Sequence, residues 1–351
     1  MNSKLLFASM ILFLSSAVFS QKSVNVDNLR LTYSERQLPQ KQFNPPFFYY
    51  AVKIDLPQSI RNLVDERGLY EKIFIAGQRA TYEPVGDDVI INAKMSPVII
   101  VGNTVKERVV EKKQRDGKVT KDYFYLMEVV YNFEANAVAT KQGQVLNRYT
   151  MCSRTRNLTF KSTEYKTQKE ASDFWRNNRE VLIEQFTREC AENAVISLTS
   201  SLNSNFGFPI IRKSTLIKTI NEKNHPENDI LRANSYEIKS RMETLDGTTP
   251  MAEDEMSDLI EYFENIPNRY SNTSSKADIQ LRYLAYFNLC RIYLFVNQPQ
   301  KVKVWADLII ANGQDKKDGQ TLKKEAEALI KRFDKWPFKT TQFDTDVYFM
   351  D

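Results

Sequence analysis

One apolar segment near the C-terminus limits the folds that this 351-residue chain can adopt. Between Ile279 and Val296 apolar side chains occupy most positions, and few polar residues interrupt them. A helix that is apolar on almost all sides has to be covered on all sides by other elements. Arg282, Asn288 and Arg291 argue against a membrane span, which needs roughly 20 apolar residues. The segment therefore predicts the central helix of a helical domain.

The flanking residues predict that this helix is one arm of a hairpin. Ser275 and Asp278 are typical of a helix start, since the hydroxyl can accept a backbone amide and the carboxylate lies at the positive end of the helix dipole. A short turn that contains Pro299 follows, and residues 301–312 again carry apolar side chains at helical spacing. We therefore expect a helical hairpin over residues 275–312.

This hairpin resembles a tetratricopeptide repeat and covers about one repeat of roughly 34 residues. The residues that match packing positions of the repeat are Tyr286, Leu289, Cys290, Tyr293, Val302, Ala306 and Ile309. The sequence departs from the pattern where Pro299 occupies a usual aromatic position, where Val302 replaces the usual alanine, and where the closing proline is absent. The resemblance implies a partner-binding groove lined by Leu284, Phe287, Arg291 and Leu294.

Two interpretations of these groove positions stay open. Leu284 and Phe287 can instead be core residues of the helical domain. Arg291 is the strongest single candidate for binding a partner, because a charge within an apolar helix needs either a partner or an exit to water. The partner would be a protein, and we expect it to be another protein of the cell envelope.

The first 20 residues are expected to be a signal peptide and not part of the fold. Lys4 supplies the positive charge, residues 5–14 the apolar core and residues 18–20 the cleavage site, which leaves Gln21 as the new N-terminus. The apolar core is too short for a membrane anchor. We expect an exported protein, periplasmic or secreted, without a transmembrane segment after cleavage.

Hydrophobic patterning divides the remaining chain into four parts. Residues 21–46 are polar and rich in proline, which predicts an extended lead-in. Residues 47–212 are expected to form an α+β domain, and residues 213–335 a helical, repeat-like domain. The aromatic tail of residues 336–351 is expected to pack on its own domain, with a role as a peptide for a partner as the alternative. The predicted fold class is α+β: a mostly antiparallel sheet with one short and one long helix, followed by an all-α domain.

Two local motifs support the α+β assignment. Asp116-Gly117 predicts a hairpin turn between two apolar strands, and Thr167 with Glu170 predicts a capping box at the start of the long helix. The order of elements is similar to small periplasmic domains such as the TolB N-terminal domain and the penicillin-binding-protein activator lipoproteins. The segments that carry this resemblance are Asp88-Val-Ile-Ile, Tyr125-x-x-Glu128-Val-Val-Tyr and Gly143-Gln-Val-Leu146. It implies a setting in envelope assembly or scaffolding.

Catalytic chemistry has little support in the sequence. The chain has one histidine, His225, which excludes a multi-histidine zinc site and leaves one candidate base for a serine triad. We expect it to be an exposed or capping loop residue. Nucleotide-binding, phosphate-loop, nucleophile-elbow and Cys-x-x-Cys motifs are absent. The net charge of +5 is mild for this length and does not indicate a nucleic-acid binder. We expect no catalytic residue, metal site or cofactor.

The three cysteines allow two interpretations. An exported protein can form disulfides, and Cys152 with Cys190 is the candidate pair. Alternatively, all three cysteines, including Cys290, are small core residues.

The sequence thus predicts an exported, non-enzymatic protein-interaction or scaffold protein of the cell envelope. A carboxylate-dependent hydrolase or cell-wall-modifying enzyme, with a cleft between the two domains, stays open, because catalytic carboxylates are brought together in space and not in sequence. A structural subunit of a larger envelope complex is a third hypothesis. The sequence does not indicate the oligomeric state.

Overall fold

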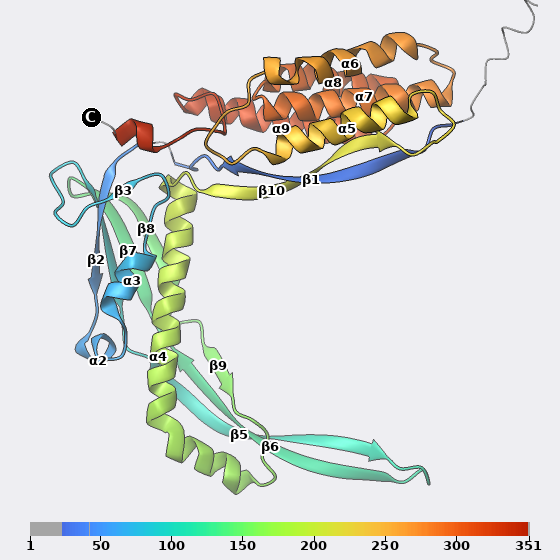
Figure 1. Ribbon diagram of the computed structural model, residues 1–351. Helices are drawn as coiled ribbons and strands as arrows, with labels where there is room; N and C mark the ends of the chain where they lie inside the picture. Colours follow the sequence, from blue (N-terminus) through green and yellow to red (C-terminus); the bar gives the residue numbers. More distant parts are fainter. Residues whose placement is uncertain (1–22, 42, 350–351) are drawn as a thin grey trace, which may run out of the picture. The chain divides into compact units, whose positions relative to one another are not determined.

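The computed structural model describes residues 23–41 and 43–349, which form two compact units (Figure 1). The helical unit contains residues 23–38 and Ile210–Val347, and the sheet unit contains Pro39–Pro209 with Tyr348 and Phe349. Strands dominate the N-terminal half and helices the C-terminal half, so the predicted α+β class is confirmed. The expected signal peptide, residues 1–20, lies outside the described residues.

The sheet unit is built from two sheets. The larger has the order β3-β2-β4-β7-β8, and only the pairings of β2 with β3 and β4 are parallel. The smaller, β5-β6-β9, is antiparallel. The strands are β2 (Tyr49–Asp55), β3 (Arg79–Ala80), β4 (Val89–Met95), β5 (Ile99–Lys113), β6 (Val119–Asn132), β7 (Ala135–Lys141), β8 (Gln144–Cys152) and β9 (Leu158–Lys161). Gly117 has a φ of +85° in the turn between β5 and β6, as the Asp-Gly motif predicts.

One long helix covers the sheets, and two short helices lie between β2 and β3. The short helices are α2 (Gln58–Arg61) and α3 (Glu66–Lys72). The long helix α4 (Gln168–Phe206) begins with the predicted capping box, in which Glu170 N donates to Thr167 Oγ1 over 3.2 Å and Thr167 N donates to the Glu170 carboxylate over 3.0 Å. Phe186 of α4 stacks on Tyr131 of β6 with ring centroids 4.3 Å apart.

The helical unit combines a two-stranded ribbon with five helices. The ribbon pairs β1 (Val26–Arg36) with β10 (Ile210–Ile220) in antiparallel register. The helices are α5 (Asn228–Glu243), α6 (Ser257–Arg269), α7 (Lys276–Phe295), α8 (Pro299–Asn312) and α9 (Lys316–Lys335). Within this unit the helices lie on one side of the ribbon (Figure 1).

The ribbon differs from the expected domain organisation. Residues 26–36 lie in the expected lead-in, and the expected boundary between residues 212 and 213 falls inside β10. The part of the chain expected to be all-α therefore contains a strand. In the ribbon, β1 and β10 supply each other's backbone hydrogen-bond partners. Because the two strands are far apart in the sequence, a local pattern cannot reveal their pairing.

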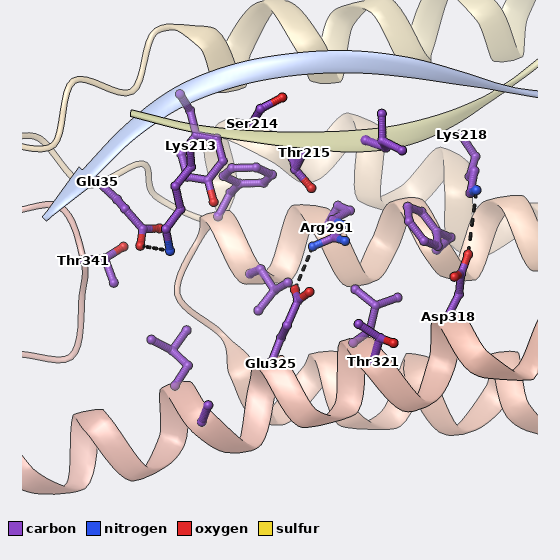
Figure 2. A pocket seen from close by; sticks show the side chains of 18 of the residues that line it. Glu35, Lys213, Ser214, Thr215, Lys218, Arg291, Asp318, Thr321, Glu325 and Thr341 are labelled. Atoms are coloured by element: carbon purple, nitrogen blue, oxygen red, sulfur yellow. Dashed lines mark hydrogen bonds and ion pairs between the residues drawn. The ribbon is translucent and has the colours of Figure 1, made fainter. Parts of the chain in front are cut away.

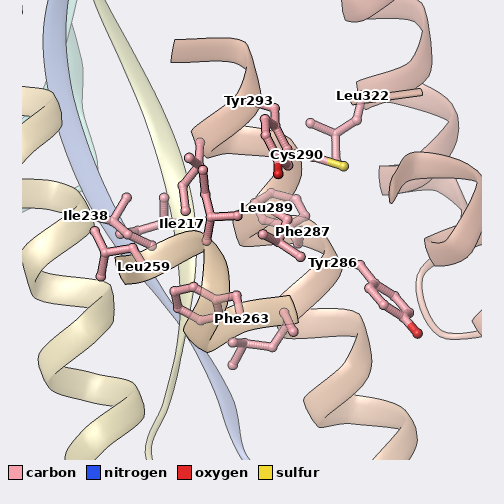
Figure 3. Close-up of a cluster of buried hydrophobic side chains, with 14 of the residues drawn as sticks. Ile217, Ile238, Leu259, Phe263, Tyr286, Phe287, Leu289, Cys290, Tyr293 and Leu322 are labelled. Carbon is pink, nitrogen blue, oxygen red and sulfur yellow. The ribbon is translucent and has the colours of Figure 1, made fainter. Parts of the chain in front are cut away.

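Helix α7 is the predicted central helix. Its Leu281, Leu284, Leu289 and Ile292 are completely buried in a cluster shared with β10 and the neighbouring helices (Figure 3). Ser275 Oγ accepts a hydrogen bond from Asp278 N, as the cap motif predicts.

The polar residues within α7 have specific partners. The Arg282 guanidinium donates to Tyr270 O over 2.6 Å and to Asn312 Oδ1 over 3.0 Å. Asn288 is completely buried and bonds to the backbone of Lys218 in β10. Lys218 N donates to Asn288 Oδ1 over 2.7 Å, and Asn288 Nδ2 donates to Lys218 O over 2.8 Å. One side-chain amide thus takes the place of a neighbouring strand and joins β10 to α7.

The tail packs on both units, each with its own residues. In the helical unit, Gln342 Nε2 donates to Ser34 O and Phe343 N donates to Gly247 O. In the sheet unit, the Tyr348 ring stacks on Phe47 with centroids 4.2 Å apart. The contacts of Gln342 and Phe343 agree with the expectation that the tail packs on its own domain, whereas Tyr348 packs on residues of the sheet unit.

The three cysteines form no disulfide, and Cys190 and Cys290 are buried. Burial raises the pKa of Cys190 to about 12, which leaves its thiol protonated and unreactive near neutral pH. Among the described residues, no helix is long and apolar enough to cross a membrane.

Candidate functional site

The helical unit contains a groove with a volume of about 670 Å³ between β10, α7 and α9 (Figure 2). We call it the β10 groove. Its β10 wall consists of Lys213–Leu216 and Lys218. The residues used below from its other sides are Glu35 and Tyr33 of β1, Phe287, Arg291 and Leu294 of α7, and Asp318, Glu325, Leu329 and Arg332 of α9.

Lys218 closes one end of the β10 groove. Its side chain is 14% exposed, and its Nζ lies 3.7 Å from the Asp318 carboxylate. The same Nζ donates to Asn28 Oδ1 over 2.9 Å and lies 4.8 Å from the Phe287 ring centroid. An ammonium over an aromatic face is attracted by the ring quadrupole. Through these contacts Lys218 connects β10 to α7 and α9 at this end of the groove.

Arg291 lies at the middle of the groove floor. Its Nη1 donates to Glu325 over 2.8 Å, and its guanidinium carbon lies 5.3 Å from the Phe287 ring centroid. Glu325 of α9 thus supplies the partner that the charge of Arg291 was predicted to need within the apolar helix. However, Arg291 Nε is buried and has no hydrogen-bond partner among the residues that the structure describes. A buried donor without an acceptor costs about 1–3 kcal/mol.

A third ion pair, between Glu35 and Lys213, lies at the other end of the groove. Burial raises the pKa of the neighbouring Tyr33, and the charge of Glu35 adds to this shift. Tyr33 therefore keeps its proton and acts as a hydrogen-bond donor. Its ring packs edge-on against Phe295 with centroids 4.6 Å apart, which fixes its position.

The structure brings together three of the four residues implied by the repeat resemblance. Phe287, Arg291 and Leu294 line the β10 groove, whereas Leu284 is completely buried in the core. Phe287 is only 4% exposed, so it belongs to both the core and the floor of the groove.

Sequence reasoning missed the contributions of β1, β10 and α9. The available signal is the segment Thr215–Ile220, whose β-branched residues favour a strand, although it lies within the predicted helical domain. The α9 residues could not be found, because their position opposite β10 depends on the packing of α9 beside α7.

The groove is lined by three carboxylates and by cations that pair with them. Each of the carboxylates Glu35, Asp318 and Glu325 forms an ion pair with a cation. No group of three or more potential metal ligands occurs in the described part of the chain.

His225 lies outside the groove. It is buried and not exposed, but it lies in the loop before α5 and accepts a backbone hydrogen bond there, which agrees with the expected capping role. Its Nδ1 accepts a hydrogen bond from Glu227 N over 3.1 Å. Burial lowers the pKa of His225, while Glu227 opposes the shift. The imidazole is a packed, neutral acceptor.

A scan of the sequence against protein-family models finds no match. A search of curated proteins also finds no similar sequence.

Proposed function

We propose that this protein is a non-enzymatic interaction or scaffold protein of the cell envelope, and that it binds a protein partner in the β10 groove. The observation that carries the proposal is the floor of the groove, where Phe287, Arg291 and Leu294 lie together and the Arg291 Nε donor lacks an acceptor. The export signal expected from the sequence supports the envelope setting.

The dimensions of the groove favour a polypeptide over a small molecule. Its α9 wall extends from Asp318 to Arg332. At 1.5 Å per helical residue this distance is about 21 Å. An extended chain rises about 3.3 Å per residue, so roughly six residues of a partner could lie along the wall.

The lining of the groove is suited to a partner segment that carries both apolar side chains and a carboxylate. Leu294 and Leu329 offer apolar contacts, and the exposed Arg332 forms no ion pair with any residue in the described ranges. A partner with apolar side chains and a carboxylate would bury apolar surface and pair with this cation. The hydrolase alternative gains no support from this groove, because its carboxylates are already paired.

Introducing a charge into the groove is expected to abolish capture of the partner. Leu294→Asp places a carboxylate on the apolar floor, where a bound segment would desolvate it. The matched control is Leu308→Asp on α8, because Leu308 is 38% exposed and does not line the groove. The chain without residues 1–20 serves as bait for the envelope fraction, with identification by mass spectrometry.

The expected result is a partner captured by the unmodified chain and by Leu308→Asp, and lost with Leu294→Asp. A partner that binds all three proteins equally would contradict a role for the groove. Point variants are preferable to deleting residues 248–351, since that deletion removes α6–α9 and much of the buried cluster around α7.

A further inference from the structure

We infer that the partner segment binds as an added β-strand along the open edge of β10, and that it is an extended peptide with alternating apolar side chains and a carboxylate. This inference rests on the proposed function, because it specifies how the β10 groove is occupied. Strand addition obtains its affinity from backbone hydrogen bonds, and its specificity from the pockets that receive every second side chain.

The contacts of Lys218 reveal which way each residue of β10 directs its backbone groups. In an antiparallel pair, consecutive residues direct their N–H and C=O groups alternately toward and away from the partner strand. Both groups of Lys218 bond to Asn288 and therefore point away from β1. Leu216 and Ser214, two and four residues earlier, must direct their groups to the same outer edge.

This outer edge is occupied at one end and open beside the groove. Beyond Lys218, Ile220 O accepts a hydrogen bond from Arg232 Nη1 over 3.3 Å. By contrast, the backbone groups of Ser214 and Leu216 bond to no group in the part of the chain that the structure describes. Ser214 and Leu216 both line the β10 groove.

The opposite edge of the ribbon shows that the fold otherwise satisfies such groups. On β1, Thr32 N donates to the Glu243 carboxylate over 3.2 Å, and Arg30 O accepts from Lys239 Nζ over 3.0 Å. Ser34 N donates to Leu245 O. An uncovered strand edge is a template for pairing with another chain, and proteins usually block it. The outer edge of β10 is open at Ser214 and Leu216, inside the β10 groove, and this position favours a role of the edge in binding.

The lining defines the chemistry of the added strand. An added strand would lie about 4.8 Å from β10, over α7 and toward α9. Every second side chain would point to the floor, where Phe287 and Leu294 favour apolar groups. A carboxylate on the segment would meet the exposed Arg332, which forms no ion pair with any of the described residues. The groove therefore fits an acidic, otherwise apolar extended peptide.

Proline substitution separates strand addition from other modes of binding. Ser214→Pro removes an N–H that points away from β1, so the ribbon pairing remains. Ser214→Ala keeps this N–H and is the matched control. Thr215→Pro removes an N–H directed to β1, and we expect it to lower the melting temperature.

The probe is a phage-displayed library of random peptides selected on the chain without residues 1–20, and affinity is measured by fluorescence anisotropy of a selected peptide. We expect selected peptides to contain Asp or Glu and to bind Ser214→Ala as they bind the unmodified chain. For Ser214→Pro we expect a loss of about tenfold, since the hydrogen bond from the Ser214 N–H to the added strand is lost.

Methylating the peptide's own backbone nitrogens, one at a time, provides a test that does not depend on the folding of a variant. An added strand donates to β10 through every second amide, so losses of affinity should alternate along the peptide.

If Leu294→Asp abolishes binding but Ser214→Pro has no effect and the methylation losses do not alternate, the groove binds a partner and strand addition is wrong. A library that yields no peptide sensitive to Leu294→Asp contradicts both the proposed function and this inference.

Discussion

Replacing Asn288 by aspartate is expected to lower the free energy of unfolding of the helical unit by at least about 3 kcal/mol at neutral pH. Asn288 is completely buried and exchanges two hydrogen bonds with the backbone of Lys218. A carboxylate could still accept from Lys218 N, but it would face Lys218 O without a proton to donate. The variant therefore buries both a charge and an unsatisfied carbonyl.

The destabilisation should depend on pH in a defined direction. Burial raises the pKa of an aspartate at position 288 above its value in the unfolded chain. A protonated carboxyl can donate to Lys218 O, so the variant regains stability as the pH falls and loses it as the pH rises through the folded-state pKa. Asn288→Ala removes both hydrogen bonds without adding a charge, so we expect it to lack this pH dependence.

Urea unfolding followed by tryptophan fluorescence measures both variants. Trp305 and Trp336 lie in the helical unit and Trp175 in the sheet unit, so a Trp175→Phe background isolates the relevant transition. A loss below about 1 kcal/mol for both variants would show that the Asn288 amide does not hold β10 on α7, because even one neutral hydrogen bond contributes about that much.

Replacing Glu227 by alanine is expected to cost the helical unit about 2–4 kcal/mol. Glu227 is only 6% exposed and accepts from Arg269 Nη1 over 2.6 Å, Tyr262 OH over 2.8 Å and Tyr270 OH over 3.1 Å. Burial, and next the Glu227 charge, raise the pKa of Tyr270 to about 12, so this phenol donates at neutral pH. The alanine variant leaves these donors without their acceptor.

The loss should reach the ribbon, because Glu227 directly precedes α5, while its donors Tyr262 and Arg269 belong to α6 and Tyr270 directly follows α6. Helix α5 supplies side chains that cover the outer edge of β1. The matched control is Glu261→Ala on α6, since Glu261 is exposed and forms no ion pair with any residue that the structure describes. Thermal unfolding should show a clear loss for Glu227→Ala and a change within about 0.5 kcal/mol for Glu261→Ala. Equal effects of the two variants would refute a special role of the Glu227 carboxylate.

The sequence predicted those features that depend on neighbouring residues. The start of α4 follows from Thr167 and Glu170, and the start of α7 from Ser275 and Asp278, because cap contacts lie within one helical turn. Arg291 was identifiable because a charge in an apolar helix is unfavourable without a partner.

The sequence could not predict the features that depend on pairing across the chain. The residues of β1 are predicted only as part of an extended lead-in, since their partner strand β10 is distant in the sequence. The β10 groove and the contacts of Lys218 cannot be predicted unless β10 is recognised as a strand. The partner of Arg291, Glu325, lies on a helix whose position beside α7 is set by tertiary packing. The candidate site was therefore only partly predictable.

Amide hydrogen exchange at β10 tests the central claim most directly. In the free chain, the amides of Ser214 and Leu216 should exchange fast, whereas those of Thr215 and Ile217, which point to β1, should exchange slowly. A peptide selected on the β10 groove should slow exchange at Ser214 and Leu216. If the peptide binds and these two amides still exchange as fast as in the free chain, the β10 edge is not where the partner binds.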